Sequence, residues 1–94
     1  MDFEWDETKR LANLAKHGLD FADLDEFDWA EAVTKLSDAR DYGEDRYKAM
    51  GDFRGRCHTI IMTWRAGKAR IISFRKARVE EVKTYEAEKE IRSS

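Results

Sequence analysis

The alternation of apolar and polar residues at the start of the chain predicts a short strand followed by a helix. Phe3 and Trp5 alternate with acidic residues, which is the period of a half-buried strand. Asp6 can then accept hydrogen bonds from the free N–H groups of a helix over residues 7–17, and Gly18 can end that helix with a positive φ. The apolar residues of this helix share one face: Leu11, Leu14 and Ala15.

The next segment predicts a second helix and then a less regular region. Phe21, Leu24 and Phe27 form an apolar stripe with acidic residues between them, as expected for a helix that begins after Asp20 and lies on a core. Residues 29–40 fit neither the helical nor the strand period cleanly. We favour a strand in that region.

Three further strands are predicted in the second half of the chain. After an exposed loop over residues 38–46, the segments "RYKAMGDF", "CHTIIMTW" and "ARIISF" are rich in β-branched and aromatic residues. The last two are joined by "RAGK", which is typical of a hairpin. Such a hairpin places Trp64 opposite Ala69 and Thr63 opposite Arg70, whether its loop has two or four residues.

Strict alternation along this hairpin separates its cations. Arg65, Arg70 and Lys76 fall on one face of the sheet, whereas Ser73 and Arg75 fall on the other. Arg70 and Arg75 can therefore contribute to one site only if the strand carries a bulge, an edge position or a bend.

The chain ends in a predicted helix over residues 77–92, with Val79, Val82 and Tyr85 along one side. The expected fold class is α+β, with a small antiparallel β-sheet of three to five strands, two N-terminal helices and one C-terminal helix. A chain of 94 residues is enough for a single domain, 1–94, with a modest core.

Charge divides the chain into two unlike halves. Residues 1–45 carry five Lys and Arg against fourteen Asp and Glu, whereas residues 46–94 carry thirteen against six. The formal net charge of −2 hides this division, because fields at short range follow local charge. Such asymmetry indicates one surface that faces a polyanion and a different second surface, or else two solvated surfaces that happen to differ.

The composition also excludes several kinds of site. A single cysteine, Cys57, rules out an internal disulfide, and with only His17 and His58 beside it there is no spaced set of zinc ligands. No phosphate-binding glycine loop is present, so we expect neither a metal nor another cofactor. No apolar run reaches the length of a membrane helix and no signal peptide is seen, so we expect a cytoplasmic protein.

The cations of the second half lie among aromatic residues on predicted strands, a combination that suits single-stranded RNA. Cleaving RNA without a metal needs a proton acceptor for the ribose 2′-OH, cations for the phosphoryl oxygens and a proton donor for the leaving oxygen. Arginine can supply only the charge. His17, Lys16 and Tyr85 are the candidate proton carriers, although His17 and Lys16 would also suit a helix C-terminus and Tyr85 would suit the core.

Three blocks of the sequence resemble one known family. "FEWDETKRLANLAKHGLDFADLDEFD", "YGEDRYKAMG" and "TWRAGKARIISFRKARVEEVKTYE" are similar to BrnT toxins of BrnT/BrnA type II toxin–antitoxin systems. The resemblance implies a RelE-like fold and a bacterial ribonuclease that blocks translation, acting on RNA either free or on the ribosome. It also implies neutralisation by a BrnA-type antitoxin, through which the complex would bind operator DNA. The acidic half is expected to face that antitoxin in part.

The resemblance and the residue chemistry together give a set of candidate site residues. The expected catalytic residues are Lys16, His17, Arg70, Arg75 and Tyr85. The expected RNA-binding residues are Arg46, Arg65, Ser73, Lys76 and Trp64. The chain departs from the family pattern at Phe74, where a small residue is common, and in an unusually acidic stretch over residues 29–41. A non-catalytic RNA-binding module, or a degenerate toxin that acts as a corepressor, is the alternative.

Overall fold

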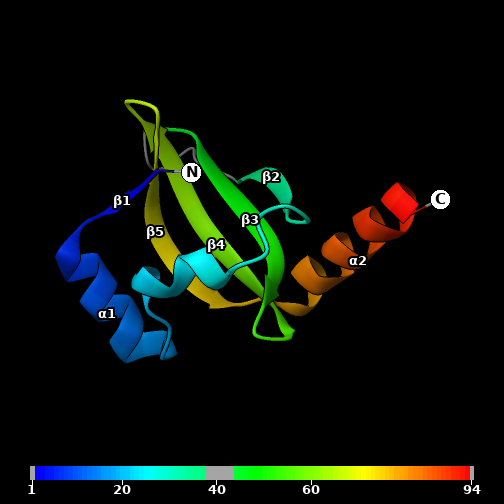
Figure 1. Ribbon diagram of the computed structural model, residues 1–94, viewed down its shortest axis with the longest axis horizontal. Coiled ribbons are helices and arrows are strands. Elements are labelled where there is room, and N and C mark those ends of the chain that lie inside the picture. Colours follow the sequence, from blue (N-terminus) through cyan, green and yellow to red (C-terminus); the bar gives the residue numbers. More distant parts are fainter. Residues whose placement is uncertain (1, 38–43, 94) are drawn as a thin grey trace.

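The computed structural model describes residues 2–37 and 44–93, which form an α+β fold around one five-stranded sheet (Figure 1). The strands lie in the order β1-β5-β4-β3-β2, with β1 parallel to β5 and the other neighbouring pairs antiparallel. The elements are β1 (Phe3–Trp5), α1 (Glu7–His17), η1 (Phe21–Glu26), β2 (Val33–Ser37), β3 (Arg46–Phe53), β4 (Arg56–Arg65), β5 (Lys68–Lys76) and α2 (Val79–Ser93). The α+β class is confirmed, but the parallel first strand makes the sheet mixed. Most of the predicted loop over residues 38–46 lies outside the described residues.

Helix α1 has the predicted ends, but its apolar face is largely exposed. The Asp6 carboxylate accepts a hydrogen bond of 2.8 Å from the Thr8 N–H, and Gly18 ends the helix with a φ of 70°. Leu11 is nevertheless 52% exposed. The buried residue of α1 is Asn13, whose side chain accepts a hydrogen bond from the backbone N–H of Phe74 and donates one to its carbonyl oxygen. The helix is thus anchored by an amide rather than by its leucines.

The need for this amide follows from the shortness of β1. That strand pairs with β5 only from Ala69 to Ile71, so the edge of β5 beyond Ile71 needs other hydrogen-bond partners. Asn13 supplies both a donor and an acceptor to Phe74 at that edge. Helix α1 is therefore fixed beside the second half of β5.

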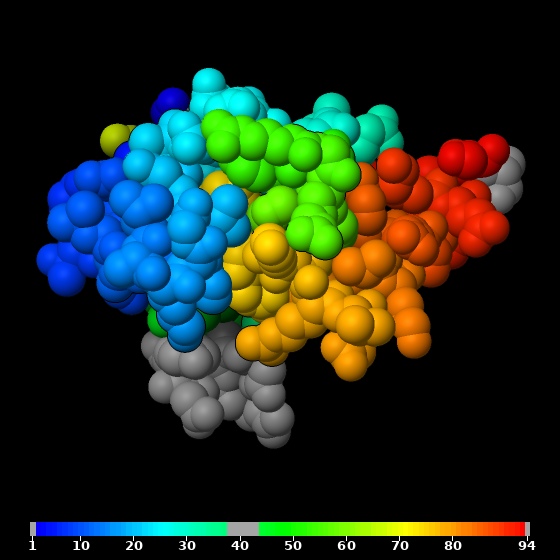
Figure 2. Space-filling view, turned by 90° about the horizontal axis from the view of Figure 1, so that it is seen from below, coloured from blue at the N-terminus to red at the C-terminus, as the bar shows by residue number. Residues whose placement is uncertain are grey.

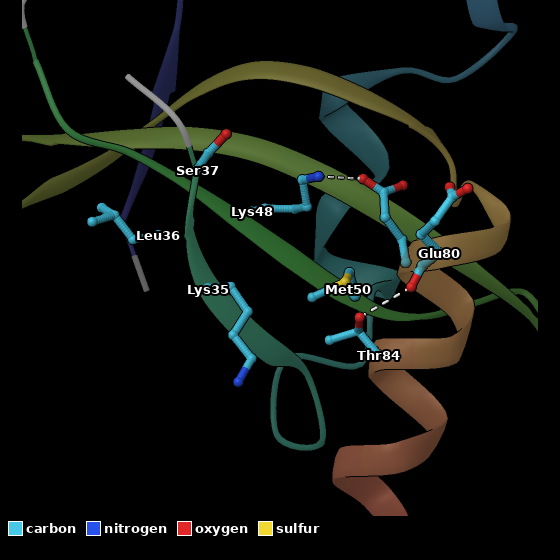
Figure 3. A pocket seen from close by; sticks show the side chains of 8 residues that line it. Lys35, Leu36, Ser37, Lys48, Met50, Glu80 and Thr84 are labelled. Carbon is cyan, nitrogen blue, oxygen red and sulfur yellow. Dashed lines mark hydrogen bonds and ion pairs between the residues drawn. The ribbon is translucent and has the colours of Figure 1, made fainter. Parts of the chain in front are cut away.

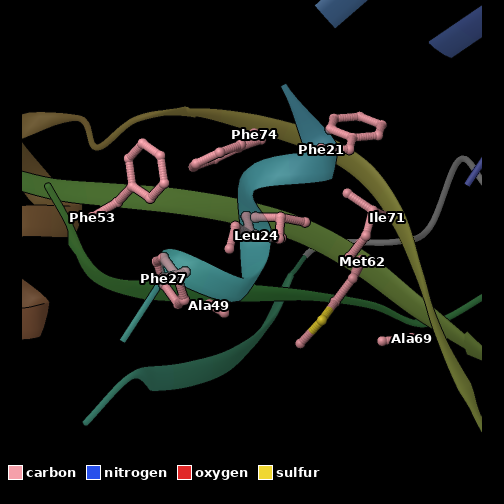
Figure 4. Close-up of a cluster of buried hydrophobic side chains, with 10 residues drawn as sticks. Phe21, Leu24, Phe27, Ala49, Phe53, Met62, Ala69, Ile71 and Phe74 are labelled. Atoms are coloured by element: carbon pink, nitrogen blue, oxygen red, sulfur yellow. The ribbon is translucent and has the colours of Figure 1, made fainter. Parts of the chain in front are cut away.

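The second predicted helix is a 3₁₀ helix, η1, rather than an α-helix. Phe21 and Leu24 are three residues apart, and Phe27 follows three later, which matches the three residues per turn of a 3₁₀ helix. All three side chains are buried against the sheet. Figure 4 shows them together with strand residues of the same hydrophobic cluster, among them Met62 and Phe74.

The predicted hairpin register is confirmed, with Trp64 opposite Ala69 and Thr63 opposite Arg70. Its loop is the two-residue turn Ala66–Gly67, in which both residues have positive φ. Such turns match the right-handed twist of the strands that they join. The hairpin between β3 and β4 turns at Arg54 and Gly55 in the same way.

Strict alternation fails in the middle of β5, because the strand contains a bulge. Met62 faces Ile71 and Ile61 faces Ser73, so Ile72 is an extra residue without its own partner on β4. Ser73 and Arg75 therefore lie on the same face of the sheet as Arg70. The prediction that Arg70 and Arg75 point to opposite faces is wrong for this reason.

Helix α2 covers part of the sheet face opposite η1 and projects beyond the sheet edge (Figure 1). Tyr85, which is 6% exposed, packs there with Val33 and Met50. Val79 was expected on the same buried side but is 67% exposed, because the other inward residue of the first turns is Glu81. Among the described residues, none of the helices has the length and apolar character that crossing a membrane requires.

Candidate functional site

Three adjoining hollows form a continuous groove on the sheet face that carries Arg75. Ser73 lines all three, and the largest measures about 540 Å³, within the size range of small-ligand sites. Figure 2 shows this surface where the end of β5 (gold) lies between α1 (blue) and α2 (orange). We call it the basic groove, because its ionisable lining residues are Lys9, Lys16, His17, Arg46, Lys48, Arg75, Lys76 and Arg78. Within the described parts of the chain, no carboxylate lines these hollows.

Each wall of the basic groove comes from a different element. The last turn of α1 supplies Lys16 and His17, and it lies beside β5 because Asn13 bonds to the β5 backbone. The bulge in β5 turns Ser73 and Arg75 toward the same side. Strand β3 supplies its cations from alternate positions, and the segment before α2 adds Arg78.

His17 has a pKa suited to accepting a proton. Burial lowers its pKa below the ordinary value of 6.5, and the charges of Lys16 and Arg75 lower it further. The imidazole is therefore mostly neutral at pH 7. A neutral imidazole beside two cations can act as a base toward a substrate hydroxyl.

Glu81 lies under the groove and binds the cations around it. It is 5% exposed, and its carboxylate forms a bidentate pair with Arg75 at 2.7 and 2.9 Å. The Lys48 ammonium lies 2.7 Å away, and the Thr59 hydroxyl donates a bond of 3.0 Å. Burial alone would raise the pKa of Glu81, but the bonds from Arg75, the Arg78 N–H, Lys48 and Thr59 hold it well below its usual range.

A further hollow adjoins the basic groove between β2 and α2 (Figure 3). It shares Ser37 and Lys48 with the groove, and the side chain of Met50 forms part of its lining. Figure 3 shows the ion pair of Lys48 beside this hollow. The Glu81 cluster therefore lies at the junction of the two surfaces.

Six of the predicted site residues meet in the basic groove. They are Lys16, His17, Arg46, Ser73, Arg75 and Lys76. They come from α1, β3 and β5, which no single stretch of sequence brings together. Both terminal nitrogens of Arg75 are bound to Glu81. Arg75 therefore contributes mainly its positive charge and a fixed side chain in the wall of the groove.

The other four predicted residues do not line the groove. Trp64 is 47% exposed but pairs with Ala69 on the opposite, apolar face of the sheet. Tyr85 lies in the core beneath α2. Arg70 shares the charged face yet lies 3.7 Å from Glu4, outside the hollows. The fourth, Arg65, lies in the hairpin beside the turn and pairs with Glu44 at 3.5 Å.

Sequence reasoning missed Lys9, Lys48, Arg78 and Glu81 as residues of this site. Lys48 follows Arg46 by two residues on a predicted strand, so period 2 alone could have placed both on one face. Arg78 belongs to the same cationic stretch as Arg75. Glu81 could not be recognised from the sequence. Helix α2 carries several glutamates, and which of them is buried depends on how the helix packs against the sheet.

Within residues 2–37 and 44–93, no group of three His, Cys, Asp or Glu side chains is placed to hold a metal ion. Burial raises the pKa of Cys57, with Glu81 and other carboxylates adding to the shift, so this thiol is a weak metal ligand and nucleophile at neutral pH.

Comparison with known proteins identifies one family. Residues 5–81 match the family described as the ribonuclease toxin, BrnT, of type II toxin–antitoxin systems. The matched span runs from β1 to Glu81 and so includes every residue of the basic groove. No curated protein matches the chain.

Proposed function

Since the chain belongs to the BrnT family of ribonuclease toxins of type II toxin–antitoxin systems, we propose that its basic groove binds and cleaves RNA without a metal ion. The observation that carries this proposal is the groove itself. Seven Lys and Arg side chains and a neutral histidine line it, and no described carboxylate faces it. Such a surface attracts phosphates and offers a base within reach of a ribose hydroxyl.

The reaction that fits these groups is attack of a ribose 2′-oxygen on the adjacent phosphate. His17 accepts the 2′-OH proton while the 2′-oxygen forms a bond to phosphorus. The bond from phosphorus to the 5′-oxygen breaks, and the Lys16 ammonium donates a proton to that leaving oxygen. The products are a 2′,3′-cyclic phosphate and a free 5′-hydroxyl.

Charge stabilisation comes from the opposite wall of the groove. Lys76, Arg78 and the Ser73 hydroxyl are the donors for the phosphoryl oxygens, on which charge grows in the transition state. Arg75 adds its charge while its terminal nitrogens stay bound to Glu81. Tyr85 has no role in this scheme, because its ring is buried in the core.

A toxin of a type II system has a protein antitoxin as its partner. We propose a BrnA-type antitoxin that contacts part of the acidic N-terminal half, and through which the complex binds operator DNA. Cleavage of cellular RNA, free or on the ribosome, would inhibit translation and requires that the toxin act in the cytoplasm. We also propose that the fold is RelE-like, and the five-stranded sheet with helices at its sides is compatible with this.

A second candidate is a toxin that binds RNA without cleaving it and serves as a corepressor. The bidentate ion pair between Arg75 and Glu81 favours this second candidate. A catalytic arginine usually forms such bidentate hydrogen bonds with a phosphate instead. Cleavage assays separate the two candidates directly.

The test is incubation of the purified protein with a single-stranded RNA oligonucleotide in EDTA, beside the same sequence with 2′-O-methyl groups. We expect cleavage of the RNA alone, ending in 2′,3′-cyclic phosphates. Intact RNA with measurable binding would favour the corepressor, and cleavage that requires a divalent metal would contradict the mechanism. In cells, induction should arrest growth, and co-expression of the antitoxin should relieve the arrest.

A further inference from the structure

Glu81 is a carboxylate with an unusual number of partners for a residue of a surface helix. Thr59 and Lys48 reach it from β4 and β3, Arg75 reaches it from β5, and the Arg78 N–H lies 2.8 Å from its Oε1 atom. The last contact is a reach from the third helical residue back to the residue before the helix, as in a capping box. One side chain therefore joins three strands to the first turn of α2.

The contacts satisfy both oxygens of the carboxylate. Oε1 accepts from Thr59, Arg75 and the Arg78 N–H, and Oε2 accepts from Arg75 and Lys48. The side chain of Arg75 is only 13% exposed and that of Lys48 is 29% exposed. Arginine and lysine lose much rotamer freedom when they are fixed in this way, so the two cations have defined positions before any ligand arrives.

We infer that Glu81 is the positioning residue of the basic groove, holding Arg75 and Lys48 in place for RNA cleavage; this inference rests on the proposed function. A purely stabilising role is a weaker explanation for the cluster. Buried ion pairs are often no more stable than apolar side chains of the same volume, so stability alone does not require two cations and a carboxylate here. The cluster lies between two hollows, where its geometry matters for a ligand.

Removal of the Glu81 carboxylate is expected to change RNA affinity and the cleavage rate in opposite directions. Glu81 neutralises part of the charge of Arg75 and Lys48, so its removal leaves the groove more positive and strengthens its attraction for phosphates. The same removal releases the two cations from their fixed positions. RNA should then bind more tightly but react more slowly, a split that simple loss of structure does not produce.

The experiment compares Glu81→Gln with Glu86→Gln, which removes the same charge from an exposed site on the same helix. Cleavage of an RNA oligonucleotide gives kcat and KM, and fluorescence anisotropy with its 2′-O-methyl analogue gives affinity over a range of salt concentrations. For Glu81→Gln we expect kcat to fall by about tenfold or more, with tighter binding and a steeper salt dependence. Glu86→Gln should match the wild type in kcat.

A second variant covers the case in which Glu81→Gln does not fold. Thr59→Val removes one donor to Glu81 in a fully buried position and changes no charge. It should lower kcat a few-fold and leave RNA affinity and its salt dependence unchanged. A kcat equal to that of the wild type in Glu81→Gln would overturn the inference, as would a loss of binding in that variant that parallels its loss of kcat. If Glu81→Gln does not fold, a kcat of Thr59→Val equal to that of the wild type would overturn it.

Failure of the inference can be told from failure of the proposed function. Wild-type protein that leaves RNA intact would overturn the proposed function, and the positioning role with it. Wild-type protein that cleaves RNA beside a Glu81→Gln variant that cleaves equally fast would overturn the positioning role alone.

Discussion

The two faces of the sheet are formed by the same strands, β3, β4 and β5, but differ in character. The face under η1 is mainly apolar and buried, with Phe74 fully buried and Met62 3% exposed. The face toward α2 carries the basic groove and a buried ion cluster around Glu81. Stability therefore depends mainly on one face, and chemistry is assigned to the other. A single extra residue, Ile72, lets Ser73 and Arg75 join the charged face while Phe74 stays in the core.

The largest expected effect of a substitution is on the apolar face. Phe74→Ala should lower the free energy of unfolding by about 3–5 kcal/mol, because it removes a fully buried ring from the cluster and leaves a cavity. Leu36→Ala is the control on an exposed strand residue and should change that free energy by less than about 0.5 kcal/mol. Urea unfolding followed by circular dichroism measures both. Equal losses would show that the core does not lie where we place it.

On the charged face, His17→Gln should affect activity and not stability. The rate of RNA cleavage should fall by about a hundredfold or more, since the variant lacks the proton acceptor. The urea midpoint should stay close to that of the wild type, because His17 is half-buried at the end of α1 and belongs to neither buried hydrophobic cluster. A variant that cleaves at the wild-type rate would remove His17 from the mechanism.

A tight contact within the apolar face predicts a smaller loss. Gly51 lies beneath the ring of Phe27, and a Cβ atom added there would lie 2.6 Å from the Phe27 Cζ atom. Gly51→Ala should therefore lower the free energy of unfolding by about 1–3 kcal/mol through overpacking. The loss should shrink in a Phe27→Leu background, where the ring is absent. An unchanged loss in that background would assign the effect to the strand backbone instead.

The smallest expected effect is a shift in the pH dependence of the charged face. Burial and the charges of Lys16 and Arg75 lower the pKa of His17, so the neutral, active imidazole persists to a lower pH than in a free histidine. The acid limb of kcat/KM should therefore have its midpoint below 6.5. In Lys16→Ala, whose rate is lower overall, this midpoint should move upward. A wild-type midpoint above 6.5 would contradict the assignment of His17 as the base.

The local features of the chain could be predicted from its sequence. Asp6 and Gly18 gave the ends of α1, and the β-branched runs gave β4 and β5 with their hairpin register. These features depend on neighbours in the sequence, which propensity and period describe well. The 3₁₀ form of η1 was within reach too, because its apolar residues recur every three positions.

Features that depend on distant contacts could not be predicted. The bulge at Ile72 changes the face of every later residue in β5. The alternation of apolar and polar residues along the strand does not predict it. The role of Asn13 depends on the short β1, which leaves part of the β5 edge for its side chain to bind, and no local pattern in the sequence shows this. Trp64 and Tyr85 had suitable chemistry for an RNA site, but the sheet and α2 place them elsewhere.

The central claim is that RNA binds the charged face of the sheet, along the basic groove. Its most direct test is a map of amide chemical-shift changes when a 2′-O-methyl oligonucleotide is added to isotope-labelled protein. We predict the largest changes at Lys16, His17, Ser73 and Arg78, with the indole of Trp64 unchanged. Changes centred on Trp64, with the groove amides unmoved, would contradict the claim.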